Sequence, residues 1–286
     1  MDRSLQRSLA QRLLALHDVR RPLVLVNAWD VASALVVQRA GLPAIATSSS
    51  AVSSALGYPD GERIPAAEML ALVARIVDHV SVPVTADLEA GYADDPQGVA
   101  NVARQLLETG AVGLNLEDGI DPATGVLRSV DAAVERIRAA HEAGQEHGVP
   151  LVINARTDVF LVMSGPPDDL LAEAIARLGA YRDAGADCLF PIGLRGPDAI
   201  RRLAGELRHP VNVLAGPGAP SVGELGGLGV ARVSLGGGPQ RAALAALAAI
   251  ADEVRDRGTY AAMQPALTHR ELDDLVAGSI AARAEG

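Results

Sequence analysis

Short apolar runs alternate along this chain with longer segments in which apolar residues recur every three or four positions. Eight of the short runs have the length and the β-branched content of buried strands. We predict strands at Leu23–Asn27, Pro43–Ser48, Val82–Asp87, Val112–Glu117, Pro150–Arg156, Cys188–Ile192, Val211–Ala215 and Arg232–Leu235. The helical spacing predicts helices over Leu5–His17, Val31–Ala40, Arg63–His79, Gln97–Thr109, Val130–His147 and Asp168–Ala184. A serine- and glycine-rich loop is expected between the second strand and Arg63.

This alternation, with strands that are apolar on both faces, is typical of a parallel sheet covered by helices. About eight such units in 286 residues favour an α/β fold of the closed (β/α)8 TIM-barrel type over an open doubly wound sheet. No boundary is evident within residues 1–256, which we assign to one barrel domain. Residues 257–286 are predicted to be a linker, Arg257–Thr268, and a last helix, His269–Arg283.

The composition of the chain indicates which kinds of partner and which cellular compartment to expect. The net charge is −10 and the basic residues are scattered, which argues against nucleic acid and against anionic membrane surfaces. The single cysteine, Cys188, excludes an internal disulfide framework and fits a reducing compartment. The first twenty residues lack the apolar core of a secretory signal, and the longest apolar run, Ala242–Ala251, is too short to span a bilayer. We therefore expect a cytoplasmic protein.

Polar residues stand where the predicted strands end, which is where barrel enzymes place their active sites. Asp87 and Glu89 are two residues apart, so on a strand both carboxylates would point to the same side. Other such residues are Ser48, Ser49 and Ser50 with Asp60 in the following loop, Asn115 and Glu117, Asn154 and Arg156, and Gly236 in a run of three glycines. Buried charges are costly unless paired, so their convergence indicates a site. Neighbouring carboxylates suit an oxygen-ligated Mg²⁺ or Mn²⁺. The alternative is a solvated loop with a helix cap at Asp94 or Asp95.

Several other chemistries are disfavoured. None of the six histidines ends a predicted strand, which argues against a zinc site or a histidine-based triad. Cys188 lies inside an apolar strand, as an inert core cysteine would. No Walker loop is present, and Gly236–Gly238 has two interpretations. It can bind an anion through backbone N–H groups at a helix start, or it can be a tight turn.

From about Leu23 to Gly236 the chain resembles the isocitrate lyase/phosphoenolpyruvate mutase superfamily. The segments that carry the resemblance are Asn27–Asp30, Thr47–Ser50, Ala55–Asp60, Thr85–Tyr92, Asn115–Gly119 and Ile153–Thr157. The resemblance implies a (β/α)8 barrel that exchanges its last helix with a neighbouring subunit, in a homodimer or homotetramer. It also implies a Mg²⁺ enzyme that acts on small 2-oxo or 2-hydroxy carboxylates. The apolar stripe of Leu272–Ala282 agrees with such a subunit contact.

The resemblance also assigns roles to individual residues. Asp87 matches the direct metal ligand, and Glu89 stands where the family usually has a second aspartate. Asp60 and Glu117 match acids that reach the metal mainly through water, and Arg156 matches the arginine that grips the substrate. Ser48, Ser49 and Ser50 match the groups that hold the substrate carboxylate. We add Trp29, Asn154, Asn212 and Gly236 as candidate substrate-binding residues, and we take Asp87, Glu89 and Glu117 as the metal-site candidates.

The departures concern the groups that decide the reaction. Lyases of the family carry a Lys-Lys/Arg-Cys-Gly-His loop after the fourth strand, whereas the loop here, Asp118–Arg128, has no Cys, Lys or His. Its only candidates for proton transfer are Asp118, Asp121, Thr124 and Arg128, and exposed aspartates are ionised at neutral pH. The Lys and Asn of the phosphonate enzymes are missing too, and Ile192 follows the proline that lyases follow with Glu.

Three functions remain open from the sequence. The leading hypothesis is a Mg²⁺-dependent lyase that cleaves a C–C bond, decarboxylation included, through an enolpyruvate-type intermediate. The second is a phosphonomutase or phosphonopyruvate hydrolase that acts on a P–C bond. The third is a non-catalytic barrel that binds a small acid.

Overall fold

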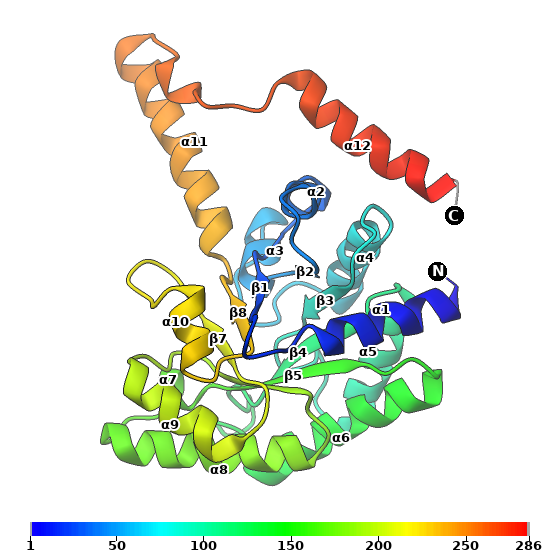
Figure 1. Ribbon diagram of the computed structural model, residues 1–286, viewed down its shortest axis with the longest axis vertical. Helices are drawn as coiled ribbons and strands as arrows, with labels where there is room; N and C mark the ends of the chain where they lie inside the picture. The colour runs from blue at the N-terminus through cyan, green and yellow to red at the C-terminus, as the bar shows by residue number, and fades with distance from the viewer. Residues whose placement is uncertain (1, 285–286) are drawn as a thin grey trace.

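The computed structural model describes residues 2–284, with side chains as far as Ser279, and its strands are the eight expected from the sequence (Figure 1). Each observed strand lies inside its predicted run, except that β5 extends one residue beyond it, to Thr157. The strands are β1 Leu23–Leu25, β2 Ile45–Ala46, β3 Val84–Asp87, β4 Gly113–Glu117, β5 Val152–Thr157, β6 Cys188–Pro191, β7 Asn212–Leu214 and β8 Arg232–Ser234.

The strands close into a parallel barrel. Strands β2 to β6 pair in chain order, and β1, β8 and β7 form a second parallel group. Single parallel bridges, Ala28 to Thr47 and Leu189 to Val211, join the two groups at their edges. The predicted (β/α)8 barrel is thereby confirmed, and the carboxyl ends of all eight strands meet at one mouth.

Helices follow the strands. Their bounds are α1 Arg3–Ala15, α2 Val31–Arg39, α3 Ser49–Ala55, α4 Ala66–Val77, α5 Pro96–Glu108, α6 Val130–His147, α7 Val159–Val162, α8 Pro167–Asp183, α9 Pro197–Leu207, α10 Val222–Gly227, α11 Gly238–Arg257 and α12 His269–Ala284. Of the two candidate caps, Asp95 is the one that caps α5, because its Oδ1 accepts the Gly98 N–H at 2.7 Å.

The predicted loop after β2 was wrong in its first part, where the chain forms α3. Ser48 is extended and stands at the N-cap position, and α3 buries Val52 and Ser53 against the barrel. The four serines of this segment made it read as a loop, since serine favours turns and helix starts. Tertiary burial of Val52 outweighs that preference.

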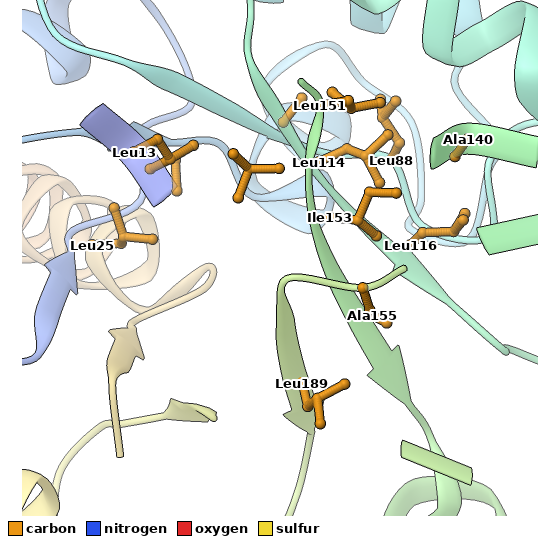
Figure 2. Packing of buried hydrophobic residues seen from close by; sticks show 14 of the residues in the cluster. Leu13, Leu25, Leu88, Leu114, Leu116, Ala140, Leu151, Ile153, Ala155 and Leu189 are labelled. Atoms are coloured by element: carbon orange, nitrogen blue, oxygen red, sulfur yellow. The ribbon is translucent and has the colours of Figure 1, made fainter. Parts of the chain in front are cut away.

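Helix α1 closes the amino end of the barrel. Leu13 has no exposed surface, and Figure 2 shows it among the buried leucine and isoleucine side chains of the strands. A Cβ at Gly113 of β4 would lie 2.9 Å from Leu13 Cδ2. Glycine fits this position because a larger residue would press on Leu13 and, at 3.0 Å, on the backbone carbonyl oxygen of Val152.

The C-terminal part leaves the barrel. Figure 1 shows α11 projecting away from the strands, and beyond it the chain runs through a short 3₁₀ turn, Ala261–Met263, to α12. The predicted last helix is confirmed as an element and contacts α2. Leu247 on α11 is 59% exposed. Residues 280–282 of the predicted apolar stripe lie beyond the described side chains, and helix exchange stays a prediction. No helix in residues 2–284 is both long and apolar enough to cross a membrane.

Candidate active site

Asp87, at the end of β3, is held from two neighbouring strands. Its Oδ2 accepts the Ser49 backbone N–H at 2.9 Å, and its own N–H donates to Thr47 Oγ1 at 2.9 Å. Asn115 on β4 donates to Asp87 Oδ1 at 3.3 Å. The carboxylate is only 8% exposed, yet each of its oxygens keeps a second lone pair. Asp87 is therefore fixed in place and able to accept one more ligand.

Glu89 reaches the same region by a different route from the one the spacing predicted. Strand β3 ends at Asp87, and Glu89 takes a left-handed backbone with φ +48°. Its carboxylate accepts the Glu62 N–H at 2.9 Å and the Tyr92 hydroxyl at 3.2 Å. Burial, together with the charges of Asp60 and Asp87, raises the pKa of Glu89 to about 7. The two-residue spacing argument was thus wrong, although the carboxylates do lie close enough to repel.

Arg156, on β5, lies between two carboxylates. Its Nη1 is 2.6 Å from Glu117 Oε2, and its Nε and Nη2 donate to the two oxygens of Asp158 at 2.6 and 2.9 Å. Burial raises the pKa of Glu117 well above its ordinary value; Arg156 opposes this shift, and the charges of Asp158 and Asp87 add to it. Burial would lower the pKa of Arg156, but Glu117 and Asp158 raise it instead, so the guanidinium stays charged.

Below the mouth, a polar cluster fills the barrel interior. Asn154 and Arg232 both donate to Asn115 Oδ1, at 2.8 and 3.3 Å, and Asn212 donates to Ser234 Oγ at 3.2 Å. Neither Asn154 nor Asn212 has exposed surface, so their predicted contact with substrate stays a prediction. Arg232 was missed by sequence reasoning, although a charged residue in an apolar strand is a visible signal.

The serines after β2 meet the glycines after β8. A Cβ at Gly237 would lie 2.9 Å from Ser50 Oγ, so the two segments approach closely here. Ser48 and Ser50 are joined through their hydroxyls at 3.1 Å. Asn27 ties the two strands together by accepting the Gly236 N–H at 2.8 Å and donating to the Thr47 carbonyl at 2.7 Å.

Two predicted residues lie at the edge of this arrangement. Trp29 follows β1 and packs partly buried against the core. Asp60 is exposed, and its charge acts on Glu89.

The two ends of the loop after β4 are buried, whereas its middle, residues 122–126, is exposed as we expected. Asp118 is 1% exposed and Arg128 is buried as well, with Arg128 Nη1 donating to the Asp118 carbonyl at 3.2 Å. Asp121 holds the turn by accepting the Ala123 N–H at 2.9 Å. Asp121 and Arg128 thus stabilise the fold of the loop itself.

The donor set fits a hard divalent cation. Asp87, Glu89 and Glu117 lie close enough for their charges to act on one another, and burial together with these charges raises the pKa values of Glu89 and Glu117. A cation would relieve that repulsion. Within residues 2–284, no three carboxylate, imidazole or thiol groups lie close enough to bind one ion directly. The arrangement therefore suits an ion with few protein ligands and several waters, as Mg²⁺ prefers.

Comparison with known proteins agrees with this geometry. The phosphoenolpyruvate phosphomutase family model matches residues 13–255. The chain belongs to this family. A crystal structure from Burkholderia cenocepacia, provisionally described as a phosphonomutase, is 42% identical, with a TM-score of 0.83 over 87% of this chain and 99% of that one.

Two lyases are also similar. The 2-methylisocitrate lyase of Salmonella typhimurium is 33% identical over 66% of this chain and 64% of that protein. The structure of 2,3-dimethylmalate lyase is 26% identical, with a TM-score of 0.82 over 99% of both chains. The resemblance to the isocitrate lyase/phosphoenolpyruvate mutase superfamily is confirmed, and the protein is an enzyme of this group of lyases and mutases.

Proposed function

We propose that this enzyme cleaves a C–C bond of a small 2-oxo or 2-hydroxy carboxylate in a Mg²⁺-dependent reaction, decarboxylation included, and leaves an enolpyruvate-type product. The single observation that supports it best is Arg156, a buried guanidinium held in one plane by Asp158 and paired with Glu117 beside Asp87. Such a fixed cation is suited to negative charge that develops on an oxygen during a reaction.

Asp87 would hold the metal directly, and Glu89, Glu117 and Asp60 would reach it through water. When bound, Mg²⁺ supplies positive charge beside the substrate's carboxylate and C2 oxygens. Ser49, Asn115 and Thr47 position Asp87 for that role.

The chain's own residues account for the remaining requirements. The Ser48–Ser50 segment and the Gly236 N–H region would hold the substrate carboxylate. When the bond beyond C3 of a 2-oxo acid breaks, its electron pair moves to C3 and negative charge builds on the C2 oxygen, toward which Arg156 would donate. The leaving fragment departs as CO₂, or as a carbonyl compound once its hydroxyl proton has passed to water, and C3 then takes a proton from water. Departure of CO₂ needs no acid from the Asp118–Arg128 loop.

A second candidate is P–C bond chemistry on the same platform, by a phosphonomutase or phosphonopyruvate hydrolase. The 42% identical structure described as a phosphonomutase favours it. The absence of the gating Lys and Asn in the loop after β4 weighs against it.

The test is a screen of oxaloacetate, malate-type acids and phosphonopyruvate with Mg²⁺, following pyruvate and phosphate. We expect pyruvate from a 2-oxo dicarboxylate, and loss of turnover in Arg156→Gln but not in the surface control Arg104→Gln. Pyruvate with phosphate from phosphonopyruvate alone would instead establish the second candidate. Turnover that persists in Arg156→Gln would contradict the first candidate function, C–C bond cleavage, because that proposal rests on Arg156.

A further inference from the structure

Arg156 makes two different kinds of contact. Toward Asp158 it presents a two-pronged fork, Nε to Oδ1 at 2.6 Å and Nη2 to Oδ2 at 2.9 Å. Toward Glu117 it presents Nη1 alone, at 2.6 Å. Bidentate pairs fix the plane of a guanidinium, whereas a single contact leaves it free to accept a different anion.

The two carboxylates are also supported very differently. Among the described residues, the Glu117 carboxylate has Arg156 as its only hydrogen-bonding or ionic partner. Asp158 is anchored through its own backbone, because its N–H donates to Asp118 Oδ1 at 2.9 Å, and the preceding Thr157 hydroxyl donates to Asp118 Oδ2 at 2.7 Å.

Asp118 is in turn held by helix α8. The Tyr181 hydroxyl donates to Asp118 Oδ2 at 2.7 Å, and Arg177 Nη1 lies 3.4 Å from the same oxygen. Tyr181 has no exposed surface and Asp118 has 1%, so this connection is screened from water. A continuous set of buried contacts therefore runs from α8 through Asp118 and Asp158 to the guanidinium.

We propose that Asp118, Asp158 and Tyr181 are positioning residues that fix the plane of Arg156, so that an anionic substrate displaces Glu117 and never Asp158. This inference rests on the proposed function, in which Arg156 binds the substrate. Displacing Glu117 breaks one contact, whereas displacing Asp158 breaks two and opposes the anchors on its backbone. The freed Glu117 carboxylate can then accept hydrogen bonds from water bound to the cation. Glu117 would thus be the partner of Arg156 before substrate binds and a water-mediated partner of the metal afterwards.

The test compares variants in oxalate binding by calorimetry at saturating Mg²⁺. Asp158→Asn should weaken oxalate by about 10- to 100-fold, as losses of supporting partners do. Tyr181→Phe, which keeps the ring, should weaken it by about two- to tenfold, the equivalent of one hydrogen bond. Tyr58→Phe is the matched control, since that hydroxyl donates to the exposed Glu68 at 2.9 Å. Glu117→Gln should weaken oxalate binding less than Asp158→Asn does, because it changes a displaceable partner of Arg156 and a group that would meet the cation only through water.

A second measurement needs no ligand. In ¹⁵N NMR of the metal-free protein, the Arg156 Nε–H signal, assigned by its loss in Arg156→Lys, should exchange slowly with water. Exchange should accelerate in Tyr181→Phe and remain unchanged in Tyr58→Phe. Failure of the wild type to bind oxalate would reject the proposed function, but it would not affect the exchange rates measured in the metal-free protein. Unchanged exchange in Tyr181→Phe, or an oxalate loss in Glu117→Gln equal to that in Asp158→Asn, would overturn the positioning proposal.

Discussion

Replacing Glu89 by glutamine should stabilise the metal-free protein, and the gain should depend on pH. The pKa of Glu89 is about 7 in the folded protein against an ordinary value of 4.5. Between these values the unfolded chain has lost the proton that the folded protein retains, so stability falls as pH rises through this window. At about 1.4 kcal/mol per pKa unit, Glu89 lowers the unfolding free energy by about 3 kcal/mol above pH 7. Glutamine keeps an acceptor for the Glu62 N–H and a donor for the Tyr92 hydroxyl.

The assay is urea unfolding followed by fluorescence of Trp29, the only tryptophan, at pH 5 to 8 with a chelator present. The unfolding free energy of Glu89→Gln minus that of the wild type should rise by about 2–3 kcal/mol across this range. Added Mg²⁺ should reduce the difference in unfolding free energy between Glu89→Gln and the wild type. The reason is that the cation relieves the repulsion between the Glu89 carboxylate and its neighbours, which the glutamine variant lacks. Glu135→Gln on the exposed face of α6 is the control and should show no such trend. A constant difference across pH would refute the reasoning.

Three further predictions concern metal, assembly and reaction. Asp87→Ala should abolish the calorimetric signal of Mg²⁺ binding with oxalate, and undiminished binding would contradict the metal assignment. We expect a homodimer or homotetramer that becomes monomeric or insoluble when truncated after Arg257, whereas a full-length monomer at micromolar concentration in sedimentation would exclude subunit exchange of α12. Activity on isocitrate or methylisocitrate should be negligible, because loss of a general acid typically costs about 10²–10⁴-fold in rate. Release of glyoxylate or pyruvate from them at lyase-like turnover would show that another group supplies the acid.

The barrel and the position of its mouth were predictable because both depend on local pattern. Apolar runs mark the strands, and polar residues directly after them must converge when parallel strands close. Glu89 shows where this reasoning fails, since the strand ends at Asp87 and the left-handed backbone of Glu89 cancels the two-residue periodicity. A left-handed backbone at a residue other than glycine leaves no periodic pattern in the sequence from which it could be predicted.

The supporting contacts were not predictable for a different reason. Tyr181 is 63 residues from Asp118 along the chain, and nothing local to either residue indicates that they meet. Arg232 lies 117 residues from Asn115, its partner in the barrel interior. Such pairs depend on which helix covers which strands, and that is known only once the fold is complete. Position in the strand pattern therefore predicts the residues at the mouth better than it predicts the residues that hold them.

The loop after β4 connects these observations to the choice of reaction. Asp118, the first residue of that loop, receives its donors from α8 and β5, and Arg177 donates to the Arg128 carbonyl at its other end at 2.8 Å. The Asp118 end of the loop thus holds Asp158 and, through it, Arg156, while Arg177 of α8 holds the Arg128 end. This anchoring supports a fixed cation at Arg156 for an enolate oxygen, and the loop contains no cysteine, lysine or histidine to protonate a carbanion. Substrates whose cleavage leaves an enolate and a neutral fragment should therefore be turned over in preference to those that need the departing carbon protonated by the protein.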